Sequence, residues 1–236
     1  MLYCCVNIFV FVITPTKAID YRWNLDTGKS DIIRLMLIII QTLLTLLGAL
    51  AFLFFFWRKL KDDYTGTQVF TGGFYTLFGL AIGFLGSKMY LPIAWLWFSL
   101  MGSFIGLMLA RFKFKYRFFE SLEGWIIGNL SIVLALNTFT LIRDFSLFNI
   151  VHLLATLATF AVYFFINKRY KKYVWYRSGR EGFSGLLAAG LYLVFRASFL
   201  LFSGIINKVI IIEAVLLGIL AFVSFLTLYN LSKKEI

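Results

Sequence analysis

Long apolar runs constrain this chain more than any other feature of its sequence. Each of the seven runs reaches roughly the 20 residues that an α-helix needs to cross the hydrocarbon core of a bilayer. We place the spans near residues 32–57, 67–87, 91–110, 122–142, 146–167, 182–202 and 206–231. Only 14% of the residues are charged, against about a quarter in soluble proteins. The sequence therefore predicts an all-α, multi-pass protein of the plasma or inner membrane, with its membrane domain over residues 32–236.

The first 31 residues form a separate unit in this interpretation. The opening stretch MLYCCVNIFVFVIT is apolar for about 14 residues, which is short for a membrane span. It lacks the basic start and the small-residue cleavage site of a secretory signal peptide. We therefore predict an interfacial segment, followed by a polar outer loop that ends at Asp31.

The basic residues predict how the spans are oriented. Fifteen of the 23 lysines and arginines fall in alternate connections, after the first, third, fifth and seventh spans. The opposite short connections hold only Lys88, Arg143 and Lys208. Because cytoplasmic loops carry the excess of basic residues, the N-terminus lies outside and the C-terminus inside. The net charge of +12 is thus explained by the membrane and gives no reason to expect nucleic acid as a partner.

Two inner segments interleave basic and aromatic residues, RFKFKYRFF at 111–119 and KRYKKYVWYR at 168–177. Such segments suit an anionic headgroup layer. They fit two interpretations, a determinant of topology with aromatic anchors or a dedicated lipid headgroup site. The pattern does not decide between the two.

The motifs of soluble enzymes are missing from the sequence. It contains no P-loop, no glycine fingerprint for nucleotides, no zinc-binding H-E-x-x-H and no nucleophile elbow. One histidine and the adjacent Cys4 and Cys5 argue against a protein-bound zinc site. We therefore expect neither a metal nor a cofactor.

Polar side chains recur at one depth on the outer side of five spans. They are Ser99, Asn137, His152, Arg196 and Glu213, each about 8–12 Å below the outer end of its span. Ionisable groups within spans are rare and mark candidate functional sites. Arg196 and Glu213 lie on consecutive antiparallel spans, so these opposite charges should meet at one level. We predict a shared polar layer that opens outward, with snorkelling of Arg196 to the headgroups as the alternative.

The order of features resembles the bacterial prolipoprotein diacylglyceryl transferase family. The resemblance rests on seven spans, a glycine-rich end of the second span, the basic arm after the third, GN in the fourth, and S-G-x(10)-F-R in the sixth. It implies transfer of diacylglycerol from phosphatidylglycerol to the lipobox cysteine of a prolipoprotein at the outer leaflet. The implied partners are an anionic phospholipid and the prolipoprotein signal segment.

Individual residues carry this resemblance. Arg196 falls on the family's late arginine, Ser184 and Gly185 on its preceding small pair, and Gly128 and Asn129 on the end of G-R-x-G-N. Gly102 matches the first glycine of H-G-G, with Ser103 in place of the second. The candidate substrate-binding residues are thus Arg196, Asn129, Asn137, Gly128, Gly102 and Ser103.

The sequence also departs from the family's motifs. Met101 stands where the family has the histidine of H-G-G, and Ile126 where it has the arginine of G-R-x-G-N. His152 is then the candidate base by position, and Glu213 the candidate carboxylate; these two are the candidate catalytic residues. Three functions follow: a divergent transferase, a non-catalytic protein that binds an anionic lipid or a lipoprotein segment, and a small transporter. The absence of two equal halves argues against the transporter.

Overall fold

Seven helices make up all the regular structure in the described part of the chain, and no strand occurs there. The structure is a computed structural model that describes residues 27–90, 95–169, 182–202 and 208–232. The helices are α2 (Thr27–Leu60), α3 (Gly66–Tyr90), α4 (Trp95–Phe114), α5 (Phe118–Arg143), α6 (Leu147–Arg169), α7 (Phe183–Phe202) and α8 (Lys208–Ser232). All seven are long and apolar enough to cross a membrane. The predicted seven-helix, multi-pass membrane protein is confirmed.

The predicted spans match these helices with small shifts at their ends. The third span, which we expected at 91–110, is displaced at both ends, since α4 runs from Trp95 to Phe114. The first helix begins at Thr27, before the predicted start of its span. The predicted outer loop up to Asp31 is wrong at its end, because residues 27–31 belong to α2. The predicted interfacial segment lies outside the described residues, as does most of the second basic–aromatic segment.

The basic residues lie at the helix ends where the positive-inside rule expects them. The last turns of α2, α4 and α6 hold the pairs Arg58 and Lys59, Arg111 and Lys113, and Lys168 and Arg169. The last turns of α3 and α5 hold single basic residues, Lys88 and Arg143. The helix ends that hold the pairs are called inner ends below, and those that hold the single basic residues are called outer ends.

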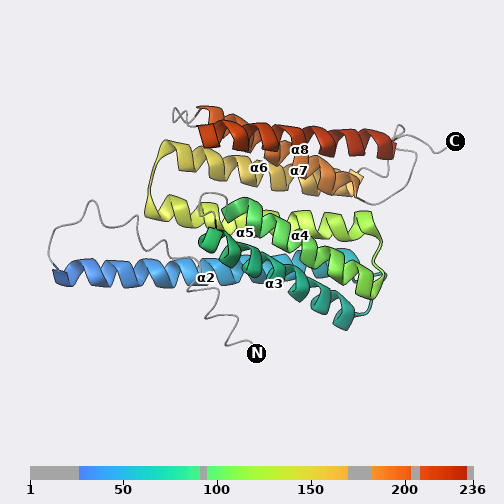
Figure 1. The fold of residues 1–236 in the computed structure, drawn as a ribbon, viewed down its shortest axis with the longest axis horizontal. Coiled ribbons are helices and arrows are strands. Elements are labelled where there is room, and N and C mark those ends of the chain that lie inside the picture. Colours follow the sequence, from blue (N-terminus) through green and yellow to red (C-terminus); the bar gives the residue numbers. More distant parts are fainter. Residues whose placement is uncertain (1–26, 91–94, 170–181, 203–207, 233–236) are drawn as a thin grey trace.

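Helix α5 is the centre of the bundle. In the most apolar stretch of α5, 56% of the residues are buried, whereas the share is 17–28% in the corresponding stretches of the other six helices. It packs on α2 on one side and on α6 and α7 on the other, so that it separates α2, α3 and α4 from α6, α7 and α8 (Figure 1). The apolar side chains on the outside of the bundle are exposed, as lipid-facing residues must be.

Glycines set the close contact between α3 and α4. A Cβ added to Gly79 would lie 2.2 Å from the carbonyl oxygen of Gly102, and one added to Gly106 would lie 2.3 Å from that of Tyr75. Small residues let membrane helices approach this closely, since lipid provides no hydrophobic force to bring them together. These glycines therefore set the distance between α3 and α4.

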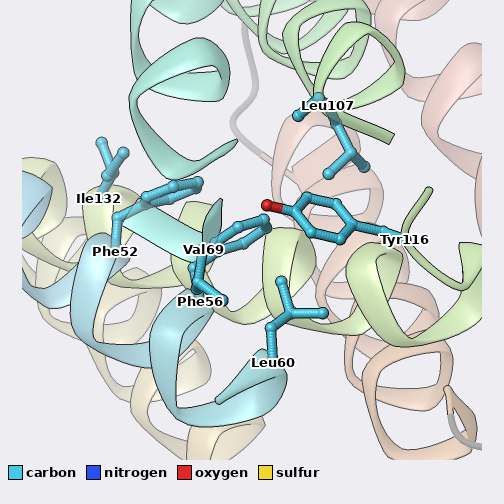
Figure 2. Close-up of a cluster of buried hydrophobic side chains, with 8 residues drawn as sticks. Phe52, Phe56, Leu60, Val69, Leu107, Tyr116 and Ile132 are labelled. Atoms are coloured by element: carbon cyan, nitrogen blue, oxygen red, sulfur yellow. The ribbon is translucent and has the colours of Figure 1, made fainter. Parts of the chain in front are cut away.

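A core of large side chains joins α2, α3 and α4 near their inner ends. Phe52 and Phe56 stack at 5.9 Å between ring centroids, and both are fully buried with Leu60. Figure 2 shows these side chains facing Tyr116 from the short connection between α4 and α5. The Tyr116 hydroxyl donates a hydrogen bond of 2.6 Å to the carbonyl oxygen of Gln68. This core fixes the inner half of α2, which carries Lys59.

Candidate functional site

An ion pair joins α7 and α8 in their outer halves, as the sequence predicted. Arg196 Nη2 lies 2.9 Å from Glu213 Oε1. Each side chain keeps 18% of its surface exposed. The pair arises because both residues lie a similar number of turns from the outer ends of two antiparallel helices. The pair is therefore partly open at the surface of the bundle.

His152 of α6 lies beside this pair. Its ring packs on Phe199 of α7 with 5.3 Å between centroids, and Phe199 follows Arg196 by one turn. The sequence prediction that these residues share one level is met, and the packing of Phe199 explains how α6 joins them.

Three buried polar atoms in this region have no hydrogen-bond partner among the described residues. They are His152 Nε2, Arg196 Nε and the hydroxyl oxygen of Tyr192. Tyr192 precedes Arg196 by four residues, about one turn, so the two side chains lie on the same face of α7. Arg196, Glu213, His152 and Tyr192 are called the outer site below.

Asn137 reaches the outer site indirectly. Its Nδ2 donates a hydrogen bond of 2.9 Å to Thr156 Oγ1, which in turn donates to the carbonyl oxygen of His152 at 2.9 Å. Asn137 thereby ties α5 to the turn of α6 that carries His152. Ser99, the fifth predicted member of the polar layer, donates to Trp95 within α4, which packs mainly on α3. The structure brings four of the five residues together.

The other candidate substrate-binding residues make contacts inside the bundle. Asn129 donates to the carbonyl oxygen of Trp125, and the indole nitrogen of Trp125 donates to Ser103 at 2.8 Å. Gly102 faces Gly79, and a Cβ on Gly128 would lie 2.4 Å from the ring of Phe52. These contacts are packing contacts, and a role of these residues in substrate binding stays a prediction.

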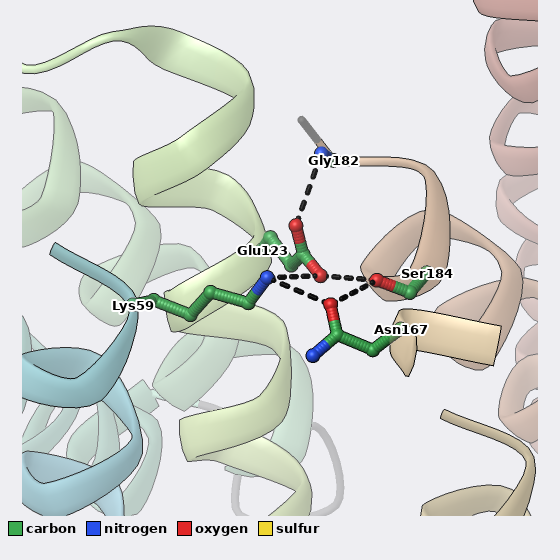
Figure 3. Close-up of polar contacts among 5 residues, drawn as sticks. All are labelled: Lys59, Glu123, Asn167, Gly182 and Ser184. Carbon is green, nitrogen blue, oxygen red and sulfur yellow. Dashed lines mark hydrogen bonds and ion pairs between the residues drawn. The ribbon is translucent and has the colours of Figure 1, made fainter. Parts of the chain in front are cut away.

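A second polar cluster lies at the inner ends of four helices, and the sequence reasoning missed it. It consists of Lys59, Glu123, Asn167, Gly182 and Ser184, called the inner cluster below (Figure 3). Lys59 Nζ lies 2.9 Å from Glu123 Oε1 and donates to Asn167 Oδ1 at 3.0 Å. The Glu123 side chain is fully buried, so this ion pair is shielded from solvent.

The Glu123 carboxylate also caps helix α7. Its Oε2 accepts a hydrogen bond of 3.0 Å from the backbone N–H of Gly182, and its Oε1 accepts one from the Ser184 hydroxyl. The first N–H groups of a helix lack partners within the helix, and its N-terminus favours negative charge. Gly182 has a φ of 109°, a conformation that favours glycine. A Cβ on Gly185 would lie 2.6 Å from Glu123 Cγ, so glycine is needed here for the close approach.

One signal in the sequence points to the inner cluster. Glu123 is an acidic residue just inside the start of a predicted span, and an unpaired carboxylate there is costly. The segment EGFSG at 181–185 places Gly182, the hydroxyl of Ser184 and the small Gly185 at the start of a predicted span. The sequence did not indicate that Lys59 would be the partner.

Fold and sites define the class of this protein as a seven-helix membrane protein whose described residues form a buried ion pair near the inner side of the membrane and a partly exposed ion pair near the outer side. Comparisons with protein-family models, with curated proteins and with solved structures found no match. Within the described ranges, no group of three or more metal-ligating side chains comes together.

Proposed function

We propose that this protein binds the phosphate group of a membrane phospholipid at the outer site. The observation that carries the proposal is the set of three buried polar atoms without partners around one guanidinium. Leaving such a group unsatisfied costs about 1–3 kcal/mol, and more for a charged group. A phosphate offers several acceptor oxygens, which match the Arg196 Nε–H, the Tyr192 hydroxyl and an N–H of His152.

The position of the outer site favours a lipid as the source of the phosphate. Arg196 lies about six residues, or roughly 9 Å, below the outer end of α7, in the outer third of the span, where a lipid phosphate is nearer than at the centre of the bilayer. Large apolar side chains next to it are exposed on both helices, among them Phe195, Ile212 and Val215. Because these side chains face lipid, a headgroup can reach the ion pair from the bilayer.

Diacylglyceryl transfer is the catalytic form of this function, and one observation favours it. In the catalytic form His152 Nε2, which has no hydrogen-bond partner among the described residues, carries no proton and can accept one, and Arg196 Nε and the Tyr192 hydroxyl hold the phosphate without it. In this reaction His152 takes the proton of the acceptor cysteine, and the thiolate attacks the diacylglyceryl carbon of phosphatidylglycerol. The bond from that carbon to the phosphate oxygen breaks, and glycerol phosphate leaves with the bonding electrons, stabilised by Arg196. Glu213 holds the guanidinium in place.

Lipid binding by the purified full-length protein tests the proposal. Native mass spectrometry compares the occupancy of a phospholipid with that of diacylglycerol, which has the same acyl chains but no phosphate. We expect Arg196→Gln to remove the preference for the phospholipid. Arg143→Gln is the matched control, because Arg143 also lies at the outer side but pairs with Asp144 at the surface, with 46% and 63% of their side chains exposed. Equal binding of diacylglycerol and phospholipid by the wild type would refute the proposal.

The transfer reaction is tested separately. Purified protein is incubated with phosphatidylglycerol and a lipobox peptide, and release of glycerol phosphate is measured. We expect His152→Ala to reduce release by about 10²–10⁴-fold, the range of general base catalysis, a far larger effect than its effect on phospholipid binding. Release that is unchanged in His152→Ala excludes this residue as the base.

A further inference from the structure

The ion pair of the outer site limits which headgroup the site can hold. Arg196 and Glu213 carry opposite charges and lie in contact, so with an uncharged His152 the formal charge of the site is zero. We propose that the outer site selects a zwitterionic phospholipid headgroup with a primary ammonium group, such as phosphoethanolamine. The inference rests on the proposed function and names the ligand class of the same site. It rests on phosphate binding alone and is an alternative to the transfer reaction described above, because it departs from the phosphatidylglycerol that the family resemblance implies.

An anionic headgroup does not match this charge balance. Its phosphate would add a negative charge to a site that already contains a carboxylate, 2.9 Å from the only described cation of that site. Like charges that share one guanidinium repel each other, and the repulsion is stronger where protein and acyl chains lower the dielectric. An excess charge in such surroundings is costly unless a counter-charge accompanies it.

A zwitterionic headgroup brings that counter-charge with it. Its phosphate accepts hydrogen bonds from Arg196 Nε and the Tyr192 hydroxyl, two atoms that have no hydrogen-bond partner among the described residues. Its ammonium group donates to Glu213, whose side chain is 18% exposed and reachable from the lipid side. Each charge of the ligand then meets an opposite charge of the protein, and the assembly stays neutral.

The ammonium must also be a hydrogen-bond donor. A primary ammonium has three N–H groups and can bond directly to the Glu213 carboxylate. The trimethylammonium of a choline headgroup has no N–H group, and its methyl groups keep the positive charge farther from the carboxylate. The site therefore distinguishes ethanolamine from choline headgroups as well as zwitterionic from anionic ones.

The test is lipid selectivity at neutral pH, measured by native mass spectrometry on full-length protein in detergent. The probes are phosphatidylethanolamine, phosphatidylcholine and phosphatidylglycerol with identical acyl chains, diacylglycerol, and soluble glycerophosphoethanolamine as a competitor. We expect the wild type to prefer phosphatidylethanolamine over phosphatidylglycerol by about tenfold, the effect of one charge-assisted hydrogen bond. Glu213→Gln should abolish this preference while binding of phospholipid over diacylglycerol persists. Glu213→Asp, which keeps the charge, and Arg143→Gln, the surface control, should retain the preference.

The possible failures are distinguishable. Phosphatidylglycerol binding at least as tightly as phosphatidylethanolamine, with loss of both in Arg196→Gln, would overturn the headgroup selectivity and leave the proposed function standing. Phospholipids that bind no better than diacylglycerol would overturn both. Competition by glycerophosphoethanolamine as strong as that of the lipid would show that a soluble compound is the ligand. The wild-type comparison does not depend on any variant, so a Glu213 variant that fails to fold still leaves a decisive result.

Discussion

The Lys59 ammonium on α2 lies 2.9 Å from the fully buried Glu123 carboxylate on α5. This pair is part of the inner cluster, which also reaches α6 through Asn167 and the start of α7 through Gly182 and Ser184. Helix α2 packs on α5, whereas α7 lies on the opposite side of α5. The inner cluster therefore holds the two sides of the bundle together at one end, and it positions the helix that carries Arg196.

Lys59→Met should destabilise the protein strongly. It leaves the Glu123 carboxylate buried without a cation, and breaking a buried ion pair in this way costs about 3–5 kcal/mol. The double variant Lys59→Met with Glu123→Gln should recover part of the loss, since neither partner is then charged. The measurement is the free energy of unfolding in detergent, by urea titration or thermal denaturation.

Lys61→Met provides the control for this prediction. Lys61 is exposed, and its ammonium lies over the ring of Trp57 at 5.3 Å. Its removal therefore leaves no buried carboxylate without a cation. Its effect should stay within about 0.5 kcal/mol. If Lys61→Met proves as damaging as Lys59→Met, the loss of basic charge at the membrane surface explains both results and the inner cluster does not.

Gly102→Ala should destabilise the contact between α3 and α4. The new Cβ would lie 2.2 Å from the carbonyl oxygen of Gly79, which is part of a helix backbone and cannot move alone. Overpacking of this kind typically costs about 1–3 kcal/mol. Gly86→Ala is the matched control on α3, where a Cβ meets nothing within 4 Å. A Gly102→Ala variant of wild-type stability that no longer binds lipid would instead support the substrate role implied by the family resemblance.

The fold was largely predictable from the sequence because hydropathy and charge act locally. A run of apolar residues defines a span wherever it packs, and basic residues mark its inner end. The helix ends were less predictable. Helix α4 continues through Arg111 and Lys113, since these long side chains pack on aromatic rings: Arg111 on Phe118 at 5.0 Å and Lys113 on Tyr75 at 5.2 Å.

The two ion pairs differed in how far the sequence could predict them. Arg196 and Glu213 lie within apolar runs on consecutive helices, so their depth alone brought them to one level. Lys59 and Glu123 lie at the ends of their spans, where charges are ordinary determinants of topology. Their contact depends on how α2 and α5 rotate about their axes, and packing between distant helices sets that rotation.

The stability of the protein should fall at high pH in a way that depends on Tyr116. Burial raises the pKa of the Tyr116 hydroxyl above its ordinary value of 10.0, and the neighbouring Tyr64 raises it further. Because the folded state holds this proton more tightly than the unfolded state, the stabilisation is complete below the ordinary pKa and is lost as the pH rises above it. Tyr116→Phe should lower stability by about 1 kcal/mol at lower pH through loss of the bond to Gln68.

A comparison of thermal stability between about pH 8 and pH 11 checks this prediction. The wild type should lose more stability over that interval than Tyr116→Phe, so the two curves should converge. Curves that run parallel throughout would show that ionisation of other groups causes the loss.

A charge exchange separates the structural role of the outer ion pair from its role in binding. Arg196→Glu alone places two carboxylates in contact, and Glu213→Arg alone places two guanidinium groups there, so each should destabilise the protein. The variant with both substitutions restores opposite charges and should recover much of the stability. It should not recover phospholipid binding, because the guanidinium then extends from α8, away from Tyr192 and His152. Binding that returns with stability would mean that any ion pair at this depth suffices, and that the partnerless atoms of Tyr192 and His152 do not contribute to the site.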